Sequence, residues 1–134
     1  MNKTKTAIYC RMASADDERL SWQKEALLKY ADCNGYTDCV CYGDNGFNGL
    51  SLDRPGMQSL ISDIQNGLVG TVIVANLSRI ARDYPVMAEW LNILKEYGVT
   101  LVSVNDAFRF PDNDFLFGLY EKLSLLKGGQ TLAV

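Results

Sequence analysis

The chain has 134 residues, a length that predicts one domain, and its 48% hydrophobic content is enough to build a core. Its formal net charge of −3 argues against a protein that grips DNA unaided, because nonspecific duplex affinity comes largely from neutralising phosphates. No apolar run approaches the ~20 residues that span a bilayer, and the N-terminus lacks the apolar core of a signal peptide. We therefore expect a cytoplasmic protein with no membrane partner.

The first half of the chain predicts two strand–helix units. Lys5–Arg11 (KTAIYCR) is expected to form a buried strand, and the helix expected over Asp16–Asn34 starts with acidic residues that suit its positive N-terminal end. Asp38–Gly43 (DCVCYG) is the second expected strand. Proline favours the first helical turn, so Pro55 is expected to open the next helix, which Gly67 ends. The apolar positions expected to face the core are Leu20, Leu27, Tyr30 and Ala31 in the first helix and Met57, Leu60, Ile61 and Ile64 in the second.

The second half continues this alternation. Thr71–Ala75 (TVIVA) is apolar in the manner of a strand buried on both faces. A turn around Arg79–Asp83 leads to a helix through Tyr97, and Val99–Val104 (VTLVSV) predicts a fourth strand. The order βαβαβαβ predicts a three-layer α/β/α domain with a mainly parallel sheet of four or five strands. The residues of the third helix that are expected to face the core are Val86, Trp90, Ile93, Leu94 and Tyr97.

The last helical candidate is Asp112–Lys127, which follows a proline and ends at two glycines. Its apolar stripe must find cover on its own domain or on a partner. The stripe consists of Phe115, Leu119, Leu123 and Leu126. We therefore expect one domain over residues 1–134 with a short C-terminal helix.

Four cysteines, Cys10, Cys33, Cys39 and Cys41, raise the question of disulfides or zinc. Three of them fall in strands predicted to be buried, where cysteine behaves as a small hydrophobe. The chain has no histidine and no CxxC spacing, the pattern typical of a zinc site. We expect reduced structural thiols and no metal.

Four arginines, Arg11, Arg54, Arg79 and Arg82, lie just beyond the expected strands. Segments that leave the carboxyl ends of parallel strands converge on one edge of an open α/β sheet, where ligands bind. Arginine is always charged and its planar fork matches phosphate. The sequence therefore predicts a site for a polyanion at this edge.

Four motifs around these arginines carry a family resemblance. They are YCRMAS at Tyr9–Ser14, GDNGFNG at Gly43–Gly49, DRPG at Asp53–Gly56 and VIVANLSRIARD at Val72–Asp83. In this order they resemble the catalytic domain of the serine recombinases, the resolvase/invertase family, and especially its large transposon-borne members. The resemblance runs from about Ala7 to Asp106.

The resemblance implies DNA recombination and integration through a serine that attacks a DNA phosphodiester. A phosphoserine-linked intermediate forms, and a second transesterification rejoins exchanged strands without a cofactor. It implies that Arg11 binds the scissile phosphate with support from Tyr9, and that Arg79 and Arg82 stabilise the transferring phosphate. Cations suit the negative charge that builds up in this reaction. The spacing of three would point Arg79 and Arg82 the same way on a helical turn.

Each of these assignments has a structural alternative. Arg11 is alternatively an edge arginine paired with Asp44, and the later pair of arginines is alternatively a solvated charge pair. Arg54 is expected either to brace the loop before its helix or to contact phosphate. Gln23 matches the family's site glutamine, and the alternative is an ordinary exposed glutamine.

The sequence departs from the family pattern at the nucleophile, because Ala13 occupies the place of the family's serine. Strand side chains alternate, so Tyr9, Arg11 and Ala13 are expected on one face. Ser14 is adjacent, but a shift of one residue turns a side chain to the opposite face. Ser14 therefore reaches the site only if the chain is irregular directly after Arg11. Otherwise it is a helix N-cap or a turn residue.

Milder departures lie in the neighbouring loops. In the site loop that starts at Asp44, Asn48 replaces a serine, and Asn76 and Ser78 stand where relatives usually place an acidic residue. The last helix lacks the arginine that relatives often carry there, for which Lys122 is a weaker substitute.

We therefore expect a serine-recombinase catalytic domain that is impaired in strand cleavage and whose DNA-binding domain is absent from this chain. The expected partners are DNA and further copies of the chain, as a homodimer and as a tetramer in a synaptic complex. Three alternatives stay open: an enzyme active through Ser14, a non-catalytic dimerisation or regulatory partner, and an unrelated small-molecule-binding α/β domain. The absence of a GxGxxG or P-loop motif disfavours the last.

Overall fold

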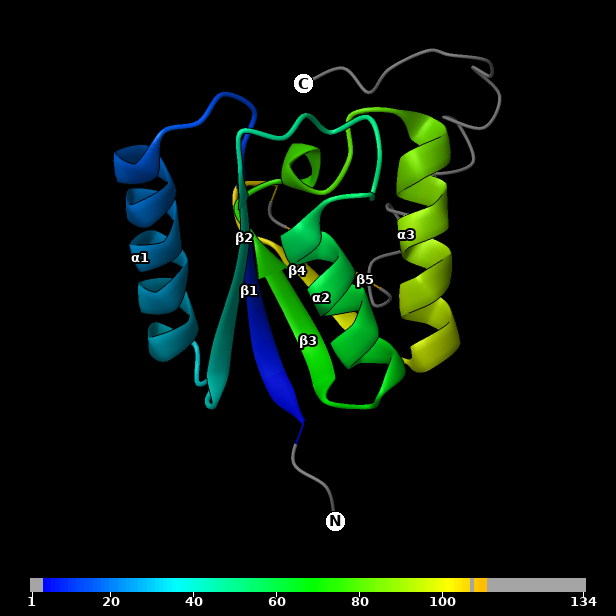
Figure 1. Ribbon diagram of the computed structural model, residues 1–134. Helices are drawn as coiled ribbons and strands as arrows, with labels where there is room; N and C mark the ends of the chain where they lie inside the picture. Colours follow the sequence, from blue (N-terminus) through cyan, green and yellow to red (C-terminus); the bar gives the residue numbers. More distant parts are fainter. Residues whose placement is uncertain (1–3, 107, 111–134) are drawn as a thin grey trace.

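A five-stranded sheet forms the centre of the fold in the computed structural model, which describes residues 4–106 and 108–110 (Figure 1). The strand order is β2-β1-β3-β4-β5, with parallel pairing throughout except between β4 and β5. The predicted mainly parallel sheet is confirmed. The strands are β1 (Lys5–Met12), β2 (Cys39–Asn45), β3 (Val69–Val74), β4 (Thr100–Ser103) and β5 (Phe108–Phe110).

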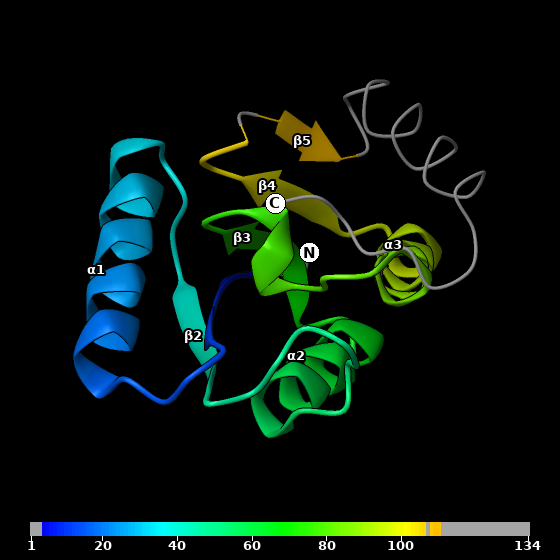
Figure 2. The ribbon, with the colours of Figure 1, turned by 90° about the horizontal axis from the view of Figure 1, so that it is seen from above.

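Helices cover both faces of the sheet, as the view from above shows (Figure 2). The helix α1 (Asp17–Cys33) packs on one face, and α2 (Pro55–Gln65) and α3 (Tyr84–Tyr97) pack on the other. A short 3-10 helix, η1 (Leu77–Arg79), lies between β3 and α3. The predicted three-layer α/β/α arrangement is therefore confirmed.

The central strand β1 contributes to both layers of the core because its side chains alternate. Ile8 and Cys10 pack under α1, whereas Ala7 and Tyr9 pack with the buried residues of α2 and α3. By the same alternation, Arg11 continues the face that carries Tyr9 and brings a charge to the end of this layer. The four core positions predicted for α2 are all buried: Met57, Leu60, Ile61 and Ile64.

The predicted core face of α3 is partly wrong. Trp90 and Leu94 are buried as predicted, but Tyr97 is 41% exposed, and Val86 and Ile93 are only half-buried. With 3.6 residues per turn, two adjacent apolar stripes share Trp90 and Leu94, and the sequence does not choose between them. The buried residues of this helix are Met87, Trp90, Leu91 and Leu94.

The burial expected for the second strand is also partly wrong. Cys41 is exposed and Cys39 is half-buried, because β2 lies at the edge of the sheet. Cys10, on the central strand, is 2% exposed as predicted. On α1, Leu27 and Ala31 are buried, while the other two predicted core residues are half-buried. All four cysteines have free thiols.

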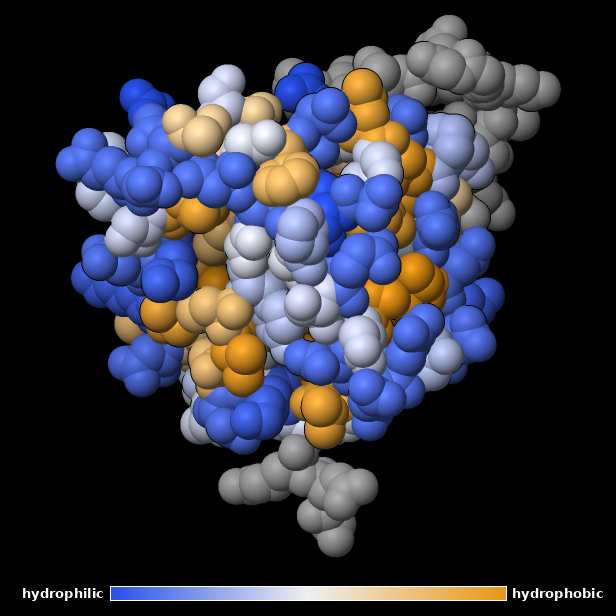
Figure 3. Space-filling view, viewed as in Figure 1, coloured by the Kyte–Doolittle hydropathy of each residue, from blue (hydrophilic) through white to orange (hydrophobic). Residues whose placement is uncertain are grey.

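The face drawn in Figure 3 is largely hydrophilic, with scattered apolar patches. In the part of the chain that the structure describes, no helix is long and apolar enough to cross a membrane. The C-terminal helix expected over residues 112–127, with its apolar stripe, lies outside the described residues.

Backbone hydrogen bonds join the loops at the carboxyl ends of β1, β2 and β3. In the β2–α2 loop (residues 46–54), the N–H groups of Gly46 and Phe47 donate to the carbonyl of Met12 at 2.8 and 3.0 Å. In the β3–α3 turn (residues 75–83), the Arg82 N–H donates to the Gly49 carbonyl at 2.8 Å. Three loops that are distant in sequence therefore form one surface at the edge where ligands bind in such sheets.

Candidate functional site

Tyr9 and Asp44 form a buried hydrogen bond between neighbouring strands. Tyr9 Oη donates to Asp44 Oδ2 at 2.7 Å, and the same carboxylate accepts from the N–H groups of Gly56 and Met57 at 2.7 and 2.9 Å. Burial, and next this hydrogen bond, raise the pKa of Tyr9 far above its ordinary value. Asp44 therefore satisfies donors that the start of α2 leaves free. It lies in β2 and forms no ion pair with Arg11, so that structural alternative is wrong.

The guanidinium of Arg11 is buried between the β2–α2 loop and the β3–α3 turn, with 2% of the residue exposed. Its Nε donates to the Arg79 carbonyl at 2.9 Å, Nη1 to the Phe47 carbonyl at 2.7 Å and Nη2 to the Ser78 carbonyl at 2.6 Å. Burial lowers the pKa of Arg11 to about 10, and the charge of Arg54 contributes. Arg11 is still a cation at pH 7, and it ties the two loops together.

Arg54 is a second buried guanidinium, also 2% exposed. Its Nη1 donates to the Arg79 carbonyl at 3.3 Å, and its Nη2 donates to the Ile80 carbonyl. Its Cζ lies 5.7 Å from the centre of the Tyr9 ring, within the range of a cation–π contact. These contacts favour the bracing role that the sequence left open for Arg54, since they fasten the β3–α3 turn to the start of α2.

The charges of Arg11 and Arg54 are balanced by carbonyl dipoles and not by carboxylates. Within the described residues neither guanidinium has a carboxylate within ion-pair distance, whereas Arg19 pairs with Asp16, with 3.4 Å between Nε and Oδ2. A buried charge without a counter-ion is unfavourable for folding. The two guanidinium groups therefore place two positive charges beneath this edge, which favour the approach of an anion.

Arg79 is the arginine at the centre of the site. It is half-buried, and its Nη1 donates to the Arg11 carbonyl at 3.0 Å. Together with Gln23 it lines a hollow of about 410 Å³ between α1 and the ends of β3 and β4. The residue thus links the buried arginines to an open surface.

Arg82 lies at the same edge of the sheet but does not line this hollow. A shared helical turn would point Arg79 and Arg82 the same way, but η1 ends at Arg79 and Arg82 lies beyond it. A Cβ on Gly49 would lie 2.5 Å from Arg82 Cγ and 3.1 Å from Arg11 Nη2, so glycine permits this close approach. Arg82 is exposed, and its guanidinium has no hydrogen-bond or ion-pair partner within the described ranges. It is available to a ligand.

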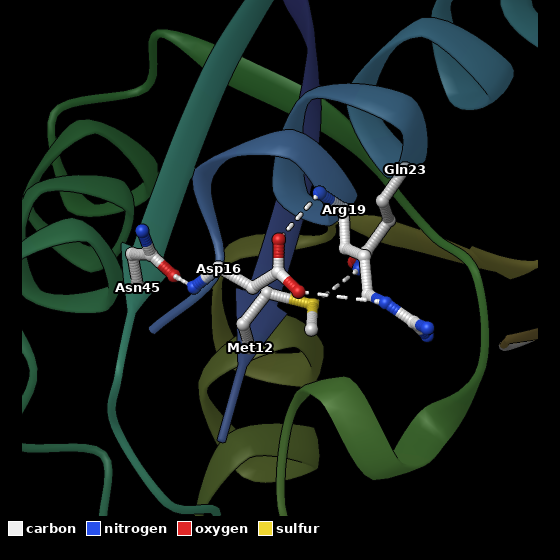
Figure 4. Close-up of polar contacts among 5 residues, drawn as sticks. All are labelled: Met12, Asp16, Arg19, Gln23 and Asn45. Atoms are coloured by element: carbon white, nitrogen blue, oxygen red, sulfur yellow. Dashed lines mark hydrogen bonds and ion pairs between the residues drawn. The ribbon is translucent and has the colours of Figure 1, made fainter. Parts of the chain in front are cut away.

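Gln23, a residue of α1, forms hydrogen bonds with the end of β1. Its Oε1 accepts from the Arg11 N–H at 3.2 Å, and its Nε2 donates to the Arg11 carbonyl at 3.4 Å. The same Nε2 donates to Met12 Sδ at 3.8 Å (Figure 4). The side chain is half-buried, so the alternative of an ordinary exposed glutamine is wrong. Gln23 therefore fastens α1 to the last two residues of β1, directly before Ala13.

Ala13 and Ser14 form an exposed bend immediately after β1, which ends at Met12. Strand alternation therefore applies to Tyr9 and Arg11 but does not extend to Ala13. The same irregularity removes the strand-based objection to Ser14.

The bend is held at its far end by Asp16 and Asn45. Asp16, and not Ser14, caps α1, because its Oδ1 accepts from the Arg19 N–H at 3.0 Å. Asn45 Oδ1 accepts from the Asp16 N–H at 2.8 Å (Figure 4). Asn45 Nδ2 donates to Asp17 Oδ1 at 2.7 Å. Sequence reasoning missed Asn45, although it stands inside the GDNGFNG motif.

The other departures from the family pattern form local hydrogen bonds. Asn48 is exposed, and its Oδ1 accepts from the Leu50 N–H at 2.9 Å. The Ser78 hydroxyl donates to Asn76 Oδ1 inside the β3–α3 turn. Both contacts stabilise turns, as such side chains commonly do. Within residues 4–106 and 108–110, no group of three His, Cys, Asp or Glu residues is placed to hold a metal ion.

Comparison with known proteins gives a consistent result. The family model described as "Resolvase, N terminal domain" matches residues 6–128. A protein of Bacillus subtilis (strain 168) named as a DNA recombinase is 28% identical over 123 residues, which are 88% of this chain and 24% of that protein. The chain therefore spans about a quarter of the length of that relative.

Solved structures are similar over almost the whole chain. The N-terminal catalytic domain of TP901-1 integrase has a TM-score of 0.80 and 28% identity, covering 92% of this chain and 93% of that one. A resolvase family site-specific recombinase from Streptococcus pneumoniae has a TM-score of 0.78 and 27% identity, covering 92% and 87%. The predicted resemblance is confirmed. Because the family model matches most of the chain, this chain belongs to the resolvase family and corresponds to the N-terminal domain of that family.

Proposed function

We propose that this chain is the catalytic domain of a site-specific DNA recombinase in which Ala13 impairs strand cleavage. One observation carries the proposal. The β3–α3 turn, which presents Arg79 and Arg82, is fastened by two buried guanidinium groups. Together with the β2–α2 loop it meets the end of β1, directly before a bend that holds alanine where the family pattern has serine.

The proposed reaction needs an oxygen nucleophile at position 13. A serine Oγ would attack phosphorus, so that an Oγ–P bond forms as the P–O3′ bond breaks, and the hydroxyl proton would end on the 3′ oxygen. Arg79 and Arg82 would stabilise the charge on the non-bridging oxygens. The second transesterification reverses the first on the exchanged strand, so no cofactor is proposed. Alanine has no oxygen to begin this sequence.

In this proposal Arg11 and Arg54 act mainly on the position of Arg79. Both donate to its carbonyl, and Arg54 is buried at the start of α2. Because Arg11 is 2% exposed, direct phosphate contact requires the loops around it to open, and its partner Phe47 belongs to the exposed part of the β2–α2 loop. Tyr9 supports the arrangement through Asp44.

The proposed partners are DNA and further copies of the chain. The net charge of −3 supports a DNA-binding region beyond these 134 residues, because a negatively charged domain gains little from phosphate neutralisation. A homodimer, and a tetramer in a synaptic complex, are proposed from family membership. The proposed location is the cytoplasm.

Two variants of this proposal are favoured by specific observations. Ala13 itself favours a non-catalytic partner that joins active recombinases. The exposed bend after Met12 favours Ser14 as a substitute nucleophile, because strand alternation no longer keeps it away from the site.

Fusion to a DNA-binding domain of known specificity allows a direct test on a duplex with two matching half-sites. The fused chain is expected to cleave no strand, and Ala13→Ser is expected to cleave. Ser14→Ala in the Ala13→Ser background serves as the matched control and is expected to leave cleavage intact. Cleavage by the unmodified chain that Ser14→Ala abolishes would replace this proposal with the Ser14 enzyme. Absence of cleavage by Ala13→Ser would favour the non-catalytic partner.

A further inference from the structure

The hollow beside Arg79 is a second feature of the same edge, separate from the bend at Ala13 and Ser14, which do not line it. It lies between the first half of α1 and the segments that follow β3 and β4, and its volume is about 410 Å³. That volume falls within the ~300–1,000 Å³ typical of small-ligand sites.

Beside apolar side chains such as Leu27 and Val104, the groups that line the hollow supply three further kinds of chemistry. Trp22 supplies an aromatic ring, and the residue is 57% exposed, far more than a core tryptophan such as Trp90, which is fully buried. Arg79 and Arg19 supply positive charge at the wall. Asn105 supplies an amide, and its side chain has no hydrogen-bond partner among the described residues.

We propose that this hollow binds one unpaired nucleotide of a DNA strand, with its base stacked on Trp22 and its phosphate on Arg79. The inference rests on the proposed function for the identity of the polymer. Base stacking on aromatic rings together with a cationic wall is the general way in which proteins hold single-stranded nucleic acid.

Arg79 is suited to the phosphate because its guanidinium is only partly used. Its Nη1 donates to the Arg11 carbonyl at 3.0 Å, whereas its Nη2 has no partner in the part of the chain that the structure describes. A phosphate on Nη2 would also lie in the positive potential of the two buried arginines. Because Arg79 joins the hollow to the end of β1, a nucleotide bound here adjoins the place where the strand would be cut.

The base must be unpaired because a base inside a duplex has both faces stacked and its edge paired. The Asn105 amide can donate to and accept from such an exposed edge. The charge of Arg19 is partly offset by Asp16, at 3.4 Å, so Arg79 is the stronger phosphate contact. The mixture of cations and amide with an aromatic ring fits a nucleotide better than an apolar peptide.

The test measures binding of a fluorescein-labelled tetrathymidylate to the chain at low salt by anisotropy. Trp22→Ala is expected to weaken binding about tenfold, in line with a lost stacking contact, and Trp22→Phe is expected to keep most of the affinity. Leu68→Ala is the matched control: Leu68 is 48% exposed and precedes β3 at the opposite end of the strand from Arg79, so affinity is expected to stay unchanged. Melting temperatures check that each variant is folded.

The two tryptophans also localise the ligand within one spectrum. Tetrathymidylate is expected to shift the indole N–H resonance of Trp22 and to leave that of buried Trp90 unchanged. Equal affinity of the chain and Trp22→Ala would overturn the inference. The inference would also be overturned if an abasic tetramer or the matching duplex bound as tightly as tetrathymidylate. Equally tight binding of thymidine monophosphate would overturn it too, since it would assign the hollow to free nucleotides. Cleavage by the fused Ala13→Ser chain does not depend on these outcomes, so the two proposals fail separately.

Discussion

Arg11 and Arg79 each donate a guanidinium hydrogen bond to the backbone carbonyl of the other. Arg11 Nε lies 2.9 Å from Arg79 O, and Arg79 Nη1 lies 3.0 Å from Arg11 O, although the residues are 68 positions apart. Arg54 adds a bond to the same Arg79 carbonyl at 3.3 Å. The end of β1 and the β3–α3 turn are therefore held as one unit by buried cations.

The Arg54→Ala variant is expected to have a free energy of unfolding about 2–4 kcal/mol lower than that of the unmodified chain. Two backbone carbonyls lose a charged donor, and a cavity forms. Arg54→Lys is also expected to be destabilising, since an ammonium lacks the planar fork that serves both carbonyls. Urea denaturation measures the change. Arg82→Ala, at an exposed site, is the control and is expected to stay within about 0.5 kcal/mol. An Arg54→Ala variant as stable as this control would refute the bracing role.

Gly56 is expected to tolerate no side chain, even though it lies in the first turn of α2. A Cβ there would lie 2.8 Å from the Gly43 carbonyl carbon and 3.0 Å from Asp44 Oδ2. Gly56→Ala is expected to destabilise the fold by about 1–3 kcal/mol despite the better helix propensity of alanine. Ser59→Ala, exposed on the same helix, is the matched control and is expected to be neutral or slightly stabilising. A gain of stability in Gly56→Ala would contradict the close approach of α2 to β2.

Cys10 is expected to resist alkylation in the folded protein. Burial raises the pKa of its thiol from 9.0 to about 12, and the thiolate is the reactive form. Iodoacetamide at pH 8.5, followed by mass spectrometry of peptides, is expected to label exposed Cys33 first and Cys10 only after unfolding in urea. Labelling of both thiols at the same rate in the folded chain would disprove this expectation.

The same shift gives a dependence of stability on pH. The unfolded chain loses the Cys10 proton near pH 9, whereas the folded chain keeps it until about pH 12. Between these values the unfolded state binds fewer protons, so the free energy of unfolding falls as pH rises. Urea midpoints measured at pH 8 and pH 10.5 are expected to fall less in Cys10→Ala than in the unmodified chain.

The fold was largely predictable because its signals are local. Continuous apolar runs marked β1 and β3, and Pro55 marked the start of α2. The face of α3 was mispredicted because adjacent apolar stripes overlap, and the exposure of Cys41 depends on β2 lying at the edge, which no local pattern reveals. Phe108–Phe110 is too short to stand out as a strand by itself.

The composition of the site was predictable, but its geometry was not. Motif order identified Arg11, Arg54 and Arg79, yet no sequence rule indicates that two of them donate to the carbonyl of the third. Side-chain-to-backbone bonds between residues far apart in sequence depend on how the loops pack. The contact of Gln23 with Arg11 near the end of β1 is likewise a tertiary interaction that no local pattern reveals.

The most direct measurement locates the covalent bond to DNA. The chain and its Ala13→Ser variant, each fused to a DNA-binding domain of known specificity, are incubated with a nicked substrate that traps the intermediate, and the adduct is mapped by peptide mass spectrometry. The account predicts no adduct on the unmodified chain and a phosphoserine link at position 13 in the variant. An adduct on Ser14 of the unmodified chain would contradict it.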